Sequence, residues 1–256
     1  MHGRLTFVGH STVLIEMGGE RLLTDPLLVD GVGHIRRQVP APDVEALATL
    51  SAILISHAHA DHLHPPSLRR LGATCPVIVP SGCARLIRRA ASGTVVELDA
   101  GERHSIGPVG IEAVAAHHDG RRHPLGRPLP ALGFLLEGPA RIYFAGDTDL
   151  FDGMAELAGR VDVALLPVGG WGPRLPPGHM DPDSAARATA LIRPAVAVPI
   201  HWGTMRSIGA PRAVSSRLPA VAFADAVARM GIGTDVRILL PGEALDLDVL
   251  APGPAR

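Results

Sequence analysis

The sequence of 256 residues contains no lysine and only two cysteines. All 24 basic residues are arginines, which excludes Schiff-base chemistry and general-base catalysis by lysine. Cys75 and Cys83 are too few for a disulfide framework, and neither belongs to a CxxC motif or a Cys/His pair. We therefore expect two reduced thiols and no structural cysteine zinc site.

Long apolar runs are also absent. No uncharged run approaches the roughly 18 residues that would cross a bilayer, and residues 1–7 lack the apolar core of a signal peptide. The net charge is −1 and the arginines form no long run, so the sequence shows no sign of the basic surface that binds nucleic acid. We expect a cytoplasmic protein with a sizeable core, no transmembrane segment and no nucleic-acid partner; the sequence is compatible with a homo-oligomer.

Short segments rich in valine, isoleucine and leucine recur along the chain and predict strands. They cover residues 5–8, 13–17, 21–24, 53–56, 76–79, 94–98, 109–115, 132–137, 141–145, 163–166, 195–200 and 236–240. Helices are predicted at residues 66–71, 82–91, 149–158, 182–192 and 220–230, with Ser81 and Asp181 or Asp183 available as helix caps. No long linker or repeat interrupts the pattern, so residues 1–256 are expected to form one domain of mixed α and β class. Residues 29–42 and 167–179 are expected to be loops, and ordered loops of such length are often functional.

The most informative segment is His57-Ala58-His59-Ala60-Asp61-His62, which places three imidazoles and a carboxylate in six residues. Imidazole nitrogen is the commonest protein ligand for zinc and similar ions, and a carboxylate can help to neutralise a second ion. Chance is the alternative in a chain with 13 histidines, but the pattern would then arise in about one chain in a thousand. The segment directly follows a predicted strand and predicts a site for one metal ion or two.

Further candidate ligands also stand just after apolar, strand-like segments. His117 and His118 follow residues 109–115, Asp147 follows residues 141–145, and His201 follows residues 195–200. If these strands share a sheet, their carboxyl ends converge on one edge. A single histidine after a strand is usually structural, but the repeated placement favours a shared metal site.

These motifs resemble the metallo-β-lactamase-fold hydrolases. The resemblance rests on HxHxDH at residues 57–62, a later single histidine, Gly146-Asp147-Thr148 and the late His201. Further motifs resemble the branch that contains ascorbate-6-phosphate lactonase and N-acyl phosphatidylethanolamine phospholipase D: Gly9-His10-Ser11-Thr12, Asp25-Pro26-Leu27, Met180-Asp181-Pro182 and residues 199–204. The resemblance implies an α+β class fold, a four-layer αββα sandwich with a metal site at one edge of the β-layers.

The resemblance also implies a ligand set for two divalent ions. His57, His59 and His118 would hold the first ion; Asp61, His62 and His201 would hold the second; and Asp147 would bridge both. The family ligand follows a pair of small residues and one variable residue, which favours His118 over His117. Zinc or manganese is expected, and iron also occupies sites of this kind.

Two such ions can share a water, lower its pKa and deliver hydroxide to a carbonyl or phosphorus. Asp61 could orient that water, and His179 is a candidate proton donor to the leaving group, although a capping or exposed histidine is an equal alternative. Candidates for substrate binding are Arg121, Arg122, Trp171, His179 and Trp202, with Arg127 nearby. The alternatives are a solvated loop for the arginines and packing beneath a loop for the tryptophans.

Several other residues have interpretations that a structure can test. Asp25 and Thr148 could orient metal ligands, or could simply serve turn chemistry. His10 is interpreted as a hydrogen-bonded structural histidine near the site. The remaining histidines, His2, His34, His64, His104 and His123, are expected to face solvent.

The preferred function is a metal-dependent hydrolase that cleaves a lactone, ester or phosphodiester bond in a small molecule, with an anionic substrate as one option. The alternatives are a nuclease of the same superfamily, a di-iron redox protein and a metal-sensing protein. A nuclease would ordinarily need an additional RNA-binding segment or a large inserted domain, and neither fits in this compact, nearly neutral chain.

Overall fold

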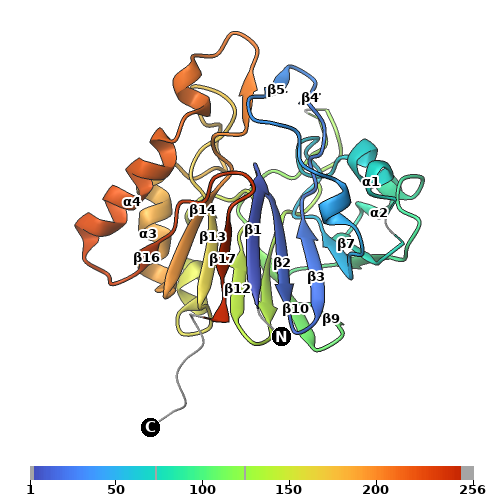
Figure 1. The fold of residues 1–256 in the computed structure, drawn as a ribbon, viewed down its shortest axis with the longest axis horizontal. Helices are drawn as coiled ribbons and strands as arrows, with labels where there is room; N and C mark the ends of the chain where they lie inside the picture. Colours follow the sequence, from blue (N-terminus) through green and yellow to red (C-terminus); the bar gives the residue numbers. More distant parts are fainter. Residues whose placement is uncertain (1–2, 73, 124, 249–256) are drawn as a thin grey trace.

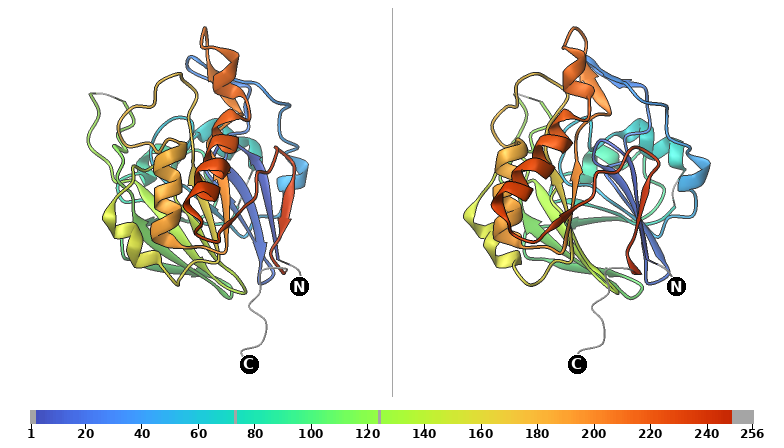
Figure 2. Two further views of the ribbon diagram at one scale, coloured as in Figure 1. Left: turned by 90° about the vertical axis from the view of Figure 1, so that its left-hand side faces the viewer. Right: turned by 60° about the vertical axis from the view of Figure 1, so that its left-hand side comes forward.

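The computed structural model describes residues 3–72, 74–123 and 125–248, which build two facing seven-stranded sheets with helices on their outer sides (Figures 1 and 2). The first sheet has the order β17-β1-β2-β3-β6-β7-β8. Its strands are β1 (Arg4–Gly9), β2 (Thr12–Met17), β3 (Glu20–Thr24), β6 (Ala52–Leu54), β7 (Val77–Pro80), β8 (Val95–Leu98) and β17 (Ala244–Asp246).

The second sheet has the order β16-β14-β13-β12-β11-β10-β9. Its strands are β9 (Arg103–Ile106), β10 (Val109–Ala115), β11 (Leu132–Glu137), β12 (Arg141–Phe144), β13 (Val163–Pro167), β14 (Val196–Ile200) and β16 (Asp235–Val236). A three-stranded sheet lies above one end of this sandwich (Figure 1). It consists of β4 (Gly31–Val32), β5 (Ile35–Arg37) and β15 (Met205–Ser207).

The helices form the outer layers. α3 (Pro182–Ile192) and α4 (Leu218–Met230) lie outside the second sheet, and α1 (Pro65–Leu71) and α2 (Ala84–Ile87) lie beside the first (Figures 1 and 2). Asp181 begins α3 with a capping box: its side chain accepts the backbone N–H of Ser184, whose hydroxyl accepts that of Asp181. The 3₁₀ turns are η1 (Glu45–Leu47), η2 (Asp152–Leu157) and η3 (Arg212–Ser215). Among the described residues, no helix combines the length and apolar character needed to cross a bilayer.

The main core lies between the two sheets. In β1 and β10 buried and partly exposed residues alternate, so Leu5, Phe7, Ile111 and Ala113 face inwards. The strands β6, β7, β13 and β14 are buried along their whole length because they are covered on both faces. Their unbroken apolar runs make these central strands readable in the sequence.

Most predicted elements are present, but four predictions were wrong in extent or type. Residues 149–158 contain the 3₁₀ turn η2 instead of an α-helix, although only Gly153 in this turn is a poor helix former. Residues 82–91 contain only the short α2, which begins at Cys83 without the predicted Ser81 cap. Of residues 236–240, only Val236 belongs to a strand, β16, which pairs with β14. After Val236 the chain moves away from β14 towards the turn before β17. Residues 29–42, expected to be a loop, contain β4 and β5.

The strand directions bring many carboxyl ends to one edge of the sandwich. β12, β13 and β14 are parallel, and β10 points the same way because both β10 and β12 pair antiparallel with β11. In the first sheet, β3 and β6 are parallel. The residues directly after these strand ends include the sequence-predicted ligands, as the next section describes.

Candidate metal centre

His57, His59 and His118 form one cluster of ring nitrogens. Nε2 of His57 and Nε2 of His118 each lie 3.0 Å from Nδ1 of His59. His57 is fully buried, whereas His59 and His118 are partly exposed. This is the set that the family resemblance implied for a first ion.

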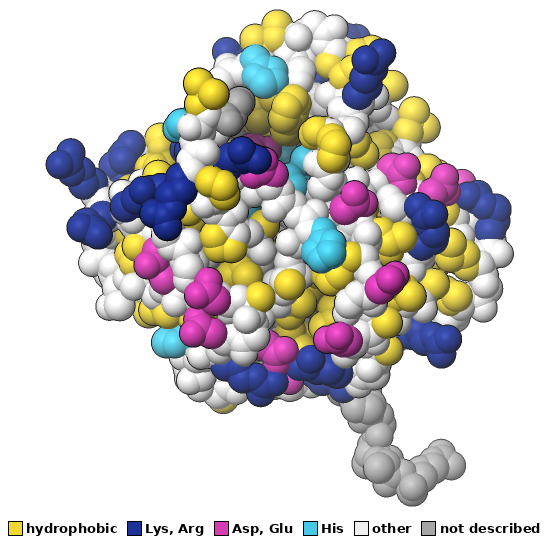
Figure 3. All heavy atoms as spheres, turned by 180° about the vertical axis from the view of Figure 1, so that it is seen from behind, with side chains coloured by type: hydrophobic (Ala, Val, Ile, Leu, Met, Phe, Trp, Pro, Cys, Tyr) yellow, Lys and Arg dark blue, Asp and Glu magenta, His cyan; other side chains and the backbone are white. Residues whose placement is uncertain are grey.

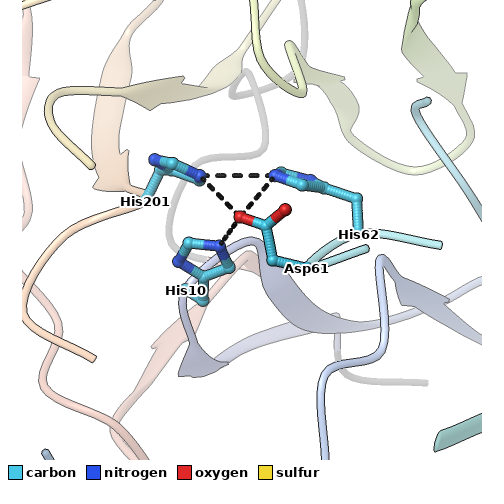
Figure 4. A group of neighbouring side chains, drawn as sticks. All are labelled: His10, Asp61, His62 and His201. Carbon is cyan, nitrogen blue, oxygen red and sulfur yellow. Dashed lines mark hydrogen bonds and ion pairs between the residues drawn. The ribbon is translucent and has the colours of Figure 1, made fainter. Parts of the chain in front are cut away.

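Asp61, His62 and His201 form a second cluster, with His10 beside it (Figure 4). Nε2 of His62 and Nε2 of His201 are 3.3 Å apart, and Oδ2 of Asp61 lies 3.7 and 4.0 Å from them. Nε2 of His10 lies 3.0 Å from the same Asp61 oxygen. His10 is buried, hydrogen-bonded and close to the site, as the sequence predicted.

Asp147 lies between the two clusters. Its Oδ2 is 3.1 Å from Nε2 of His62, 3.4 Å from Nε2 of His201 and 3.9 Å from Nε2 of His57. Its Oδ1 is buried and makes no hydrogen bond to any described residue. An unpaired buried carboxylate oxygen calls for an explanation, and a bridging role towards metal ions supplies one.

The opposite nitrogens of these rings are anchored by the protein. Nδ1 of His118 lies 2.8 Å from the carbonyl of Gly178, and Nδ1 of His201 lies 2.8 Å from the carbonyl of Gly169. A carbonyl only accepts, so each Nδ1 carries the hydrogen and each Nε2 presents a lone pair to the interior. Nδ1 of His62 similarly meets Oδ2 of Asp25 at 2.7 Å. Such anchoring of the non-ligating nitrogen is typical of metal-binding histidines.

The resulting set of inward lone pairs fits divalent cations. Ring nitrogens of neighbouring imidazoles face one another at 3.0 to 3.3 Å, a separation at which two lone pairs repel unless a proton or a cation lies between them. Nitrogen and carboxylate donors are the ligands that zinc, manganese and iron accept. The donor set therefore matches the expected metal ions.

The protonation states suit metal binding as well. Burial, together with the neighbouring imidazoles, lowers the pKa of His59 to about 4, and burial lowers the pKa of His201 to about 3, so both rings are neutral at pH 7. His62 behaves differently: burial alone would lower its pKa, but Asp147, Asp61 and Asp25 raise it well above the usual value. The carboxylates thus favour a positive charge at Nε2 of His62, which a metal ion would supply in place of the proton.

The backbone around the site is held in unusual conformations. His10, Asp25 and His201 adopt positive φ values of 58°, 33° and 60°, a region that residues other than glycine rarely occupy. Such strain is characteristic of functional sites. Gly146 has a φ of 61°, and a Cβ there would lie 2.6 Å from Cβ of Ser56, so only glycine allows Asp147 its place.

Comparison with known proteins identifies the family. The sequence profile of the beta-lactamase superfamily domain matches residues 20–202, which is more than half of the chain. This chain belongs to that superfamily. A metal-dependent hydrolase of Thermococcus kodakarensis is 34% identical over 95% of this chain and 99% of its own length. The N-acyl-phosphatidylethanolamine-hydrolyzing phospholipase D 1 of Caenorhabditis elegans is 31% identical over 78% of this chain and 63% of its own.

Solved structures share the superfamily fold. A metallo hydrolase of Ignicoccus hospitalis superposes with a TM-score of 0.73 at 24% identity and covers 96% of this chain and 98% of its own. CmlA, a diiron beta-hydroxylase of Streptomyces venezuelae, superposes with a TM-score of 0.74 at 21% identity over 96% of this chain and 54% of its own. At these identities the likeness shows the fold alone. Together the comparisons confirm the predicted metallo-β-lactamase superfamily, the α+β sandwich and the prediction of a metal-dependent hydrolase.

The structure also shows which of the adjacent histidines, His117 or His118, lies at the site. The ring of His117 stacks on Phe151 at 4.1 Å, away from the cluster, and His117 is exposed. His118 faces His59 and is the one that belongs to the site. The preference for His118 that the family resemblance implied agrees with this geometry.

A cleft of about 810 Å³ opens above the metal-binding residues. One wall is apolar and is formed by Val32, Ile35, Trp171, Pro176 and Pro177. His59, Asp61, His118, Asp147 and His179 face the cleft from the metal centre. The cleft thus combines an apolar wall with a metal-binding floor.

His179 lies where the cleft meets Asp147. Its Nε2 is 3.3 Å from Oδ2 of Asp147, and its side chain is 10% exposed. Burial alone would lower its pKa, but the hydrogen bond and charge of Asp147 raise the pKa of His179 above the usual 6.5. A protonated imidazole beside the centre is suited to donate a proton to a leaving group.

The two arginines proposed for substrate binding already have protein partners. Arg121 lines the cleft and forms an ion pair with Asp119 at 2.8 Å. Arg122 donates to the carbonyls of Ala58 and Leu63, and so braces the loop that carries the HxHxDH motif. Arg121 stays a candidate for binding an anionic substrate group. Arg122 also lines the cleft, but its guanidinium is engaged by these two carbonyls.

Trp202 was wrongly placed at the substrate pocket. It is 3% exposed, stacks on Phe7 with ring centroids 6.0 Å apart, and donates to the carbonyl of Pro199. Its indole therefore packs in the core beneath the loop, the alternative considered for both tryptophans. Trp171, in contrast, lines the cleft.

Three smaller interpretations are also decided. His64 does not face solvent: it is buried and caps α1, with its Nδ1 accepting the backbone N–H of Ser67 at 3.2 Å. The hydroxyl of Thr148 accepts the N–H of His117 and donates to the carbonyl of Asp149, so Thr148 joins the loops that follow β12 and β10 through backbone groups. Asp25 orients His62 and thus acts on a ligand. His34 and His123 are exposed and His104 is partly exposed, while His2 lies outside the described residues.

Proposed function

We propose that this protein is a dinuclear metal-dependent hydrolase that cleaves a phosphodiester, ester or lactone bond of a small molecule with an apolar group beside the scissile bond. One observation carries the proposal: two sets of inward-facing imidazole nitrogens meet at Asp147 on the floor of a cleft. The named activity of the Caenorhabditis elegans relative favours a phosphodiester among these bonds.

The residues divide the work as follows. His57, His59 and His118 would hold one ion, Asp61, His62 and His201 the other, and Asp147 both. When bound, such a pair supplies a hydroxide nucleophile at neutral pH and a Lewis acid for the carbonyl or phosphoryl oxygen. His179 would hold a proton at Nε2 and pass it to the leaving oxygen. Zinc and manganese suit this donor set best, and iron also fits.

The cleft walls indicate the kind of substrate. Val32, Trp171 and the two prolines at 176 and 177 offer an apolar surface next to the reacting centre. Arg121 lines the same cleft and would bind an anionic substituent of the substrate if its ion pair with Asp119 were broken. We therefore expect an amphiphilic small molecule.

The surface supports a small substrate over a nucleic acid. On the face that Figure 3 shows, basic side chains gather at the upper left and are interspersed with acidic ones elsewhere; the net charge of −1 gives little overall attraction to a phosphate backbone. A cytoplasmic location, a single domain over residues 1–256 and a homo-oligomeric state stay predictions.

Metal analysis of protein purified without added metal, followed by reloading with zinc, manganese or iron, tests the proposal. The reloaded protein is assayed with bis(p-nitrophenyl) phosphate, p-nitrophenyl butyrate and an aromatic lactone. We expect two ions per chain and hydrolysis of at least one of these substrates, and we expect Asp147→Ala and His59→Ala to lose metal and turnover while staying folded. Unchanged turnover in either variant would contradict the assignment, and iron-dependent redox activity without hydrolysis would replace it with the di-iron alternative.

A further inference from the structure

Trp171 is fixed in place by the three-stranded sheet β15-β5-β4. Its carbonyl accepts the backbone N–H of Ser207 in β15 at 2.7 Å. Its side chain packs against a small apolar cluster of Leu27, Ile35 and Met205, which is separate from the main core. The ring of His34 meets the indole edge to face, with centroids 5.0 Å apart and an interplanar angle of 82°.

The indole N–H of Trp171 points at a metal-binding carboxylate. Nε1 donates to Oδ2 of Asp61 at 3.1 Å, across 110 positions of sequence. The same oxygen is 3.0 Å from Nε2 of His10. The indole N–H can only donate a hydrogen bond, so the carboxylate oxygen of Asp61 is the acceptor and is held in place by the indole.

His10, the other partner of Asp61, is itself locked to the second cluster. Its backbone N–H donates to the hydroxyl of Thr204 at 2.8 Å, and its carbonyl accepts the N–H of His201 at 2.8 Å. Its ring lies 4.0 Å from that of His201. The orientation of Asp61 is thus set by two residues from outside the HxHxDH loop, one of them carried by the three-stranded sheet.

We propose that Trp171 is a positioning residue for Asp61 and thereby sets the affinity of the second metal ion without affecting the first. The proposal rests on the dinuclear function above. Groups that hydrogen-bond a metal ligand fix its direction, and their loss typically weakens metal binding about 10- to 100-fold. The first cluster is anchored elsewhere, through Ser56 for His57 and Gly178 for His118, so its ion should not respond.

The same indole forms part of the cleft wall. A substrate that packs on the ring of Trp171 therefore acts on the residue that orients Asp61. When two binding sites are coupled, each ligand changes the affinity for the other by the same factor. The second metal ion and an apolar substrate group packed on Trp171 should therefore each bind more tightly when the other is present. This gives the three-stranded sheet a role: it carries the side chain that joins the apolar wall to the metal centre.

Trp171→Phe tests the proposal, because it keeps an aromatic wall and removes the N–H. The matched control is Trp202→Phe, which also removes an indole N–H, but one donated to the carbonyl of Pro199 in the core. Zinc affinities of both sites are measured by competition with a chromophoric chelator. We expect Trp171→Phe to weaken the second zinc about 10- to 100-fold with the first unchanged, and Trp202→Phe to bind both ions as the wild type does.

A spectroscopic signal distinguishes positioning from a general structural role. The chain has two tryptophans, so in Trp202→Phe all indole emission comes from Trp171. Its emission should change on binding of the second zinc equivalent and not on binding of the first. His34→Ala, which leaves the indole N–H in place but removes its edge contact, should weaken the second zinc to a smaller extent and so provides a second test if Trp171→Phe fails to fold.

The outcomes are distinct. Equal affinities in Trp171→Phe and the wild type, equal weakening of both ions, or emission that follows the first ion would overturn the role of Trp171 and leave the hydrolase function intact. A wild-type protein that binds a single zinc ion would overturn both.

Discussion

Oδ2 of Asp25 lies 2.7 Å from Nδ1 of His62, and this contact joins the end of β3 to the ligand loop after β6. Asp25 is fully buried, and its carboxylate also accepts the N–H of Ser56 at 2.7 Å and the hydroxyl of Ser56 at 2.5 Å. A carboxylate accepts all three hydrogens. Asp25 therefore keeps the proton of His62 on Nδ1 and its lone pair on Nε2.

Asp25→Asn should disrupt this arrangement with little change in shape. If the amide oxygen keeps the N–H of Ser56, its NH₂ group faces Nδ1–H of His62, and the imidazole must move its proton to Nε2. We expect about a 10- to 100-fold loss in affinity for the second zinc, measured by chelator competition. Asp183→Asn, on the exposed surface of α3, is the control; equal zinc binding in the two variants would contradict the role of Asp25.

Gly146→Ala should damage both stability and metal binding. The left-handed φ of 61° costs about 1–2 kcal/mol for a residue with a Cβ, and the added carbon would lie 2.6 Å from Cβ of Ser56, which bonds Asp25 and His57. We expect a loss of more than about 2 kcal/mol in the free energy of unfolding together with weaker zinc binding.

Gly159→Ala is the matched control for this variant. Gly159 also has a positive φ, of 75°, but no atom lies within 4 Å of an added Cβ. It should show the backbone strain alone, about 1 kcal/mol, with normal zinc affinity. Urea unfolding and chelator competition measure both quantities, and similar losses in the two glycine variants would show that the contact with Ser56 is unimportant.

Much of the candidate metal centre could be predicted from the sequence because most of its candidate ligands follow buried strands. Apolar runs such as residues 53–56 and 195–200 mark strands that are covered on both faces, and the next polar residue marks the edge of the sheet. Short edge strands such as β9, β15 and β17 carry no such run, so they were missed. Their pairing depends on neighbours far away in the chain.

The partners of the ligands could not be predicted, for a different reason. Gly169 and Gly178 act through backbone carbonyls, which leave no residue signal. Trp171 and Trp202 both lie in loops, and only packing shows that the first reaches Asp61 and the second Phe7. His64 is the exception: Pro65 and Pro66 mark a helix start, so its capping position was readable from the sequence.

Asp162 should contribute to stability in a pH-dependent way. It accepts the backbone N–H of Arg141 at 2.8 Å and pairs with its guanidinium at 2.6 Å, which links β12 to the start of β13. Burial would raise the pKa of Asp162, but the bonds from Arg141 lower it below the usual 3.8. A carboxyl whose pKa is lower in the folded state adds stability above its unfolded pKa and loses it as the pH falls through the folded value.

Asp162→Asn should thus be less stable than the wild type at neutral pH, by at most about 1 kcal/mol because solvent screens the partly exposed pair. The difference should shrink as the pH falls below 3.8 and disappear below the lowered pKa of the folded state. Urea unfolding over this range measures it, with Asp235→Asn, an exposed partner of Arg237, as the control. A difference that is independent of pH would show that the charge of Asp162 has no part in it.

The loss of activity in His179→Gln should depend on the leaving group of the substrate, because only a poor leaving group needs a proton donor. Nε2 of His179 lies 3.3 Å from Asp147 at the cleft, and a protonated imidazole there helps most when the departing oxygen is a poor leaving group. With an alkyl ester or alkyl phosphodiester, kcat should fall about 10²- to 10⁴-fold. With the corresponding p-nitrophenyl substrate, whose anion departs without a proton, the fall should be much smaller. Zinc content should stay normal, and His123→Gln, at the exposed rim of the cleft, should match the wild type; an equal loss on both substrates would instead assign His179 to the binding of metal or substrate.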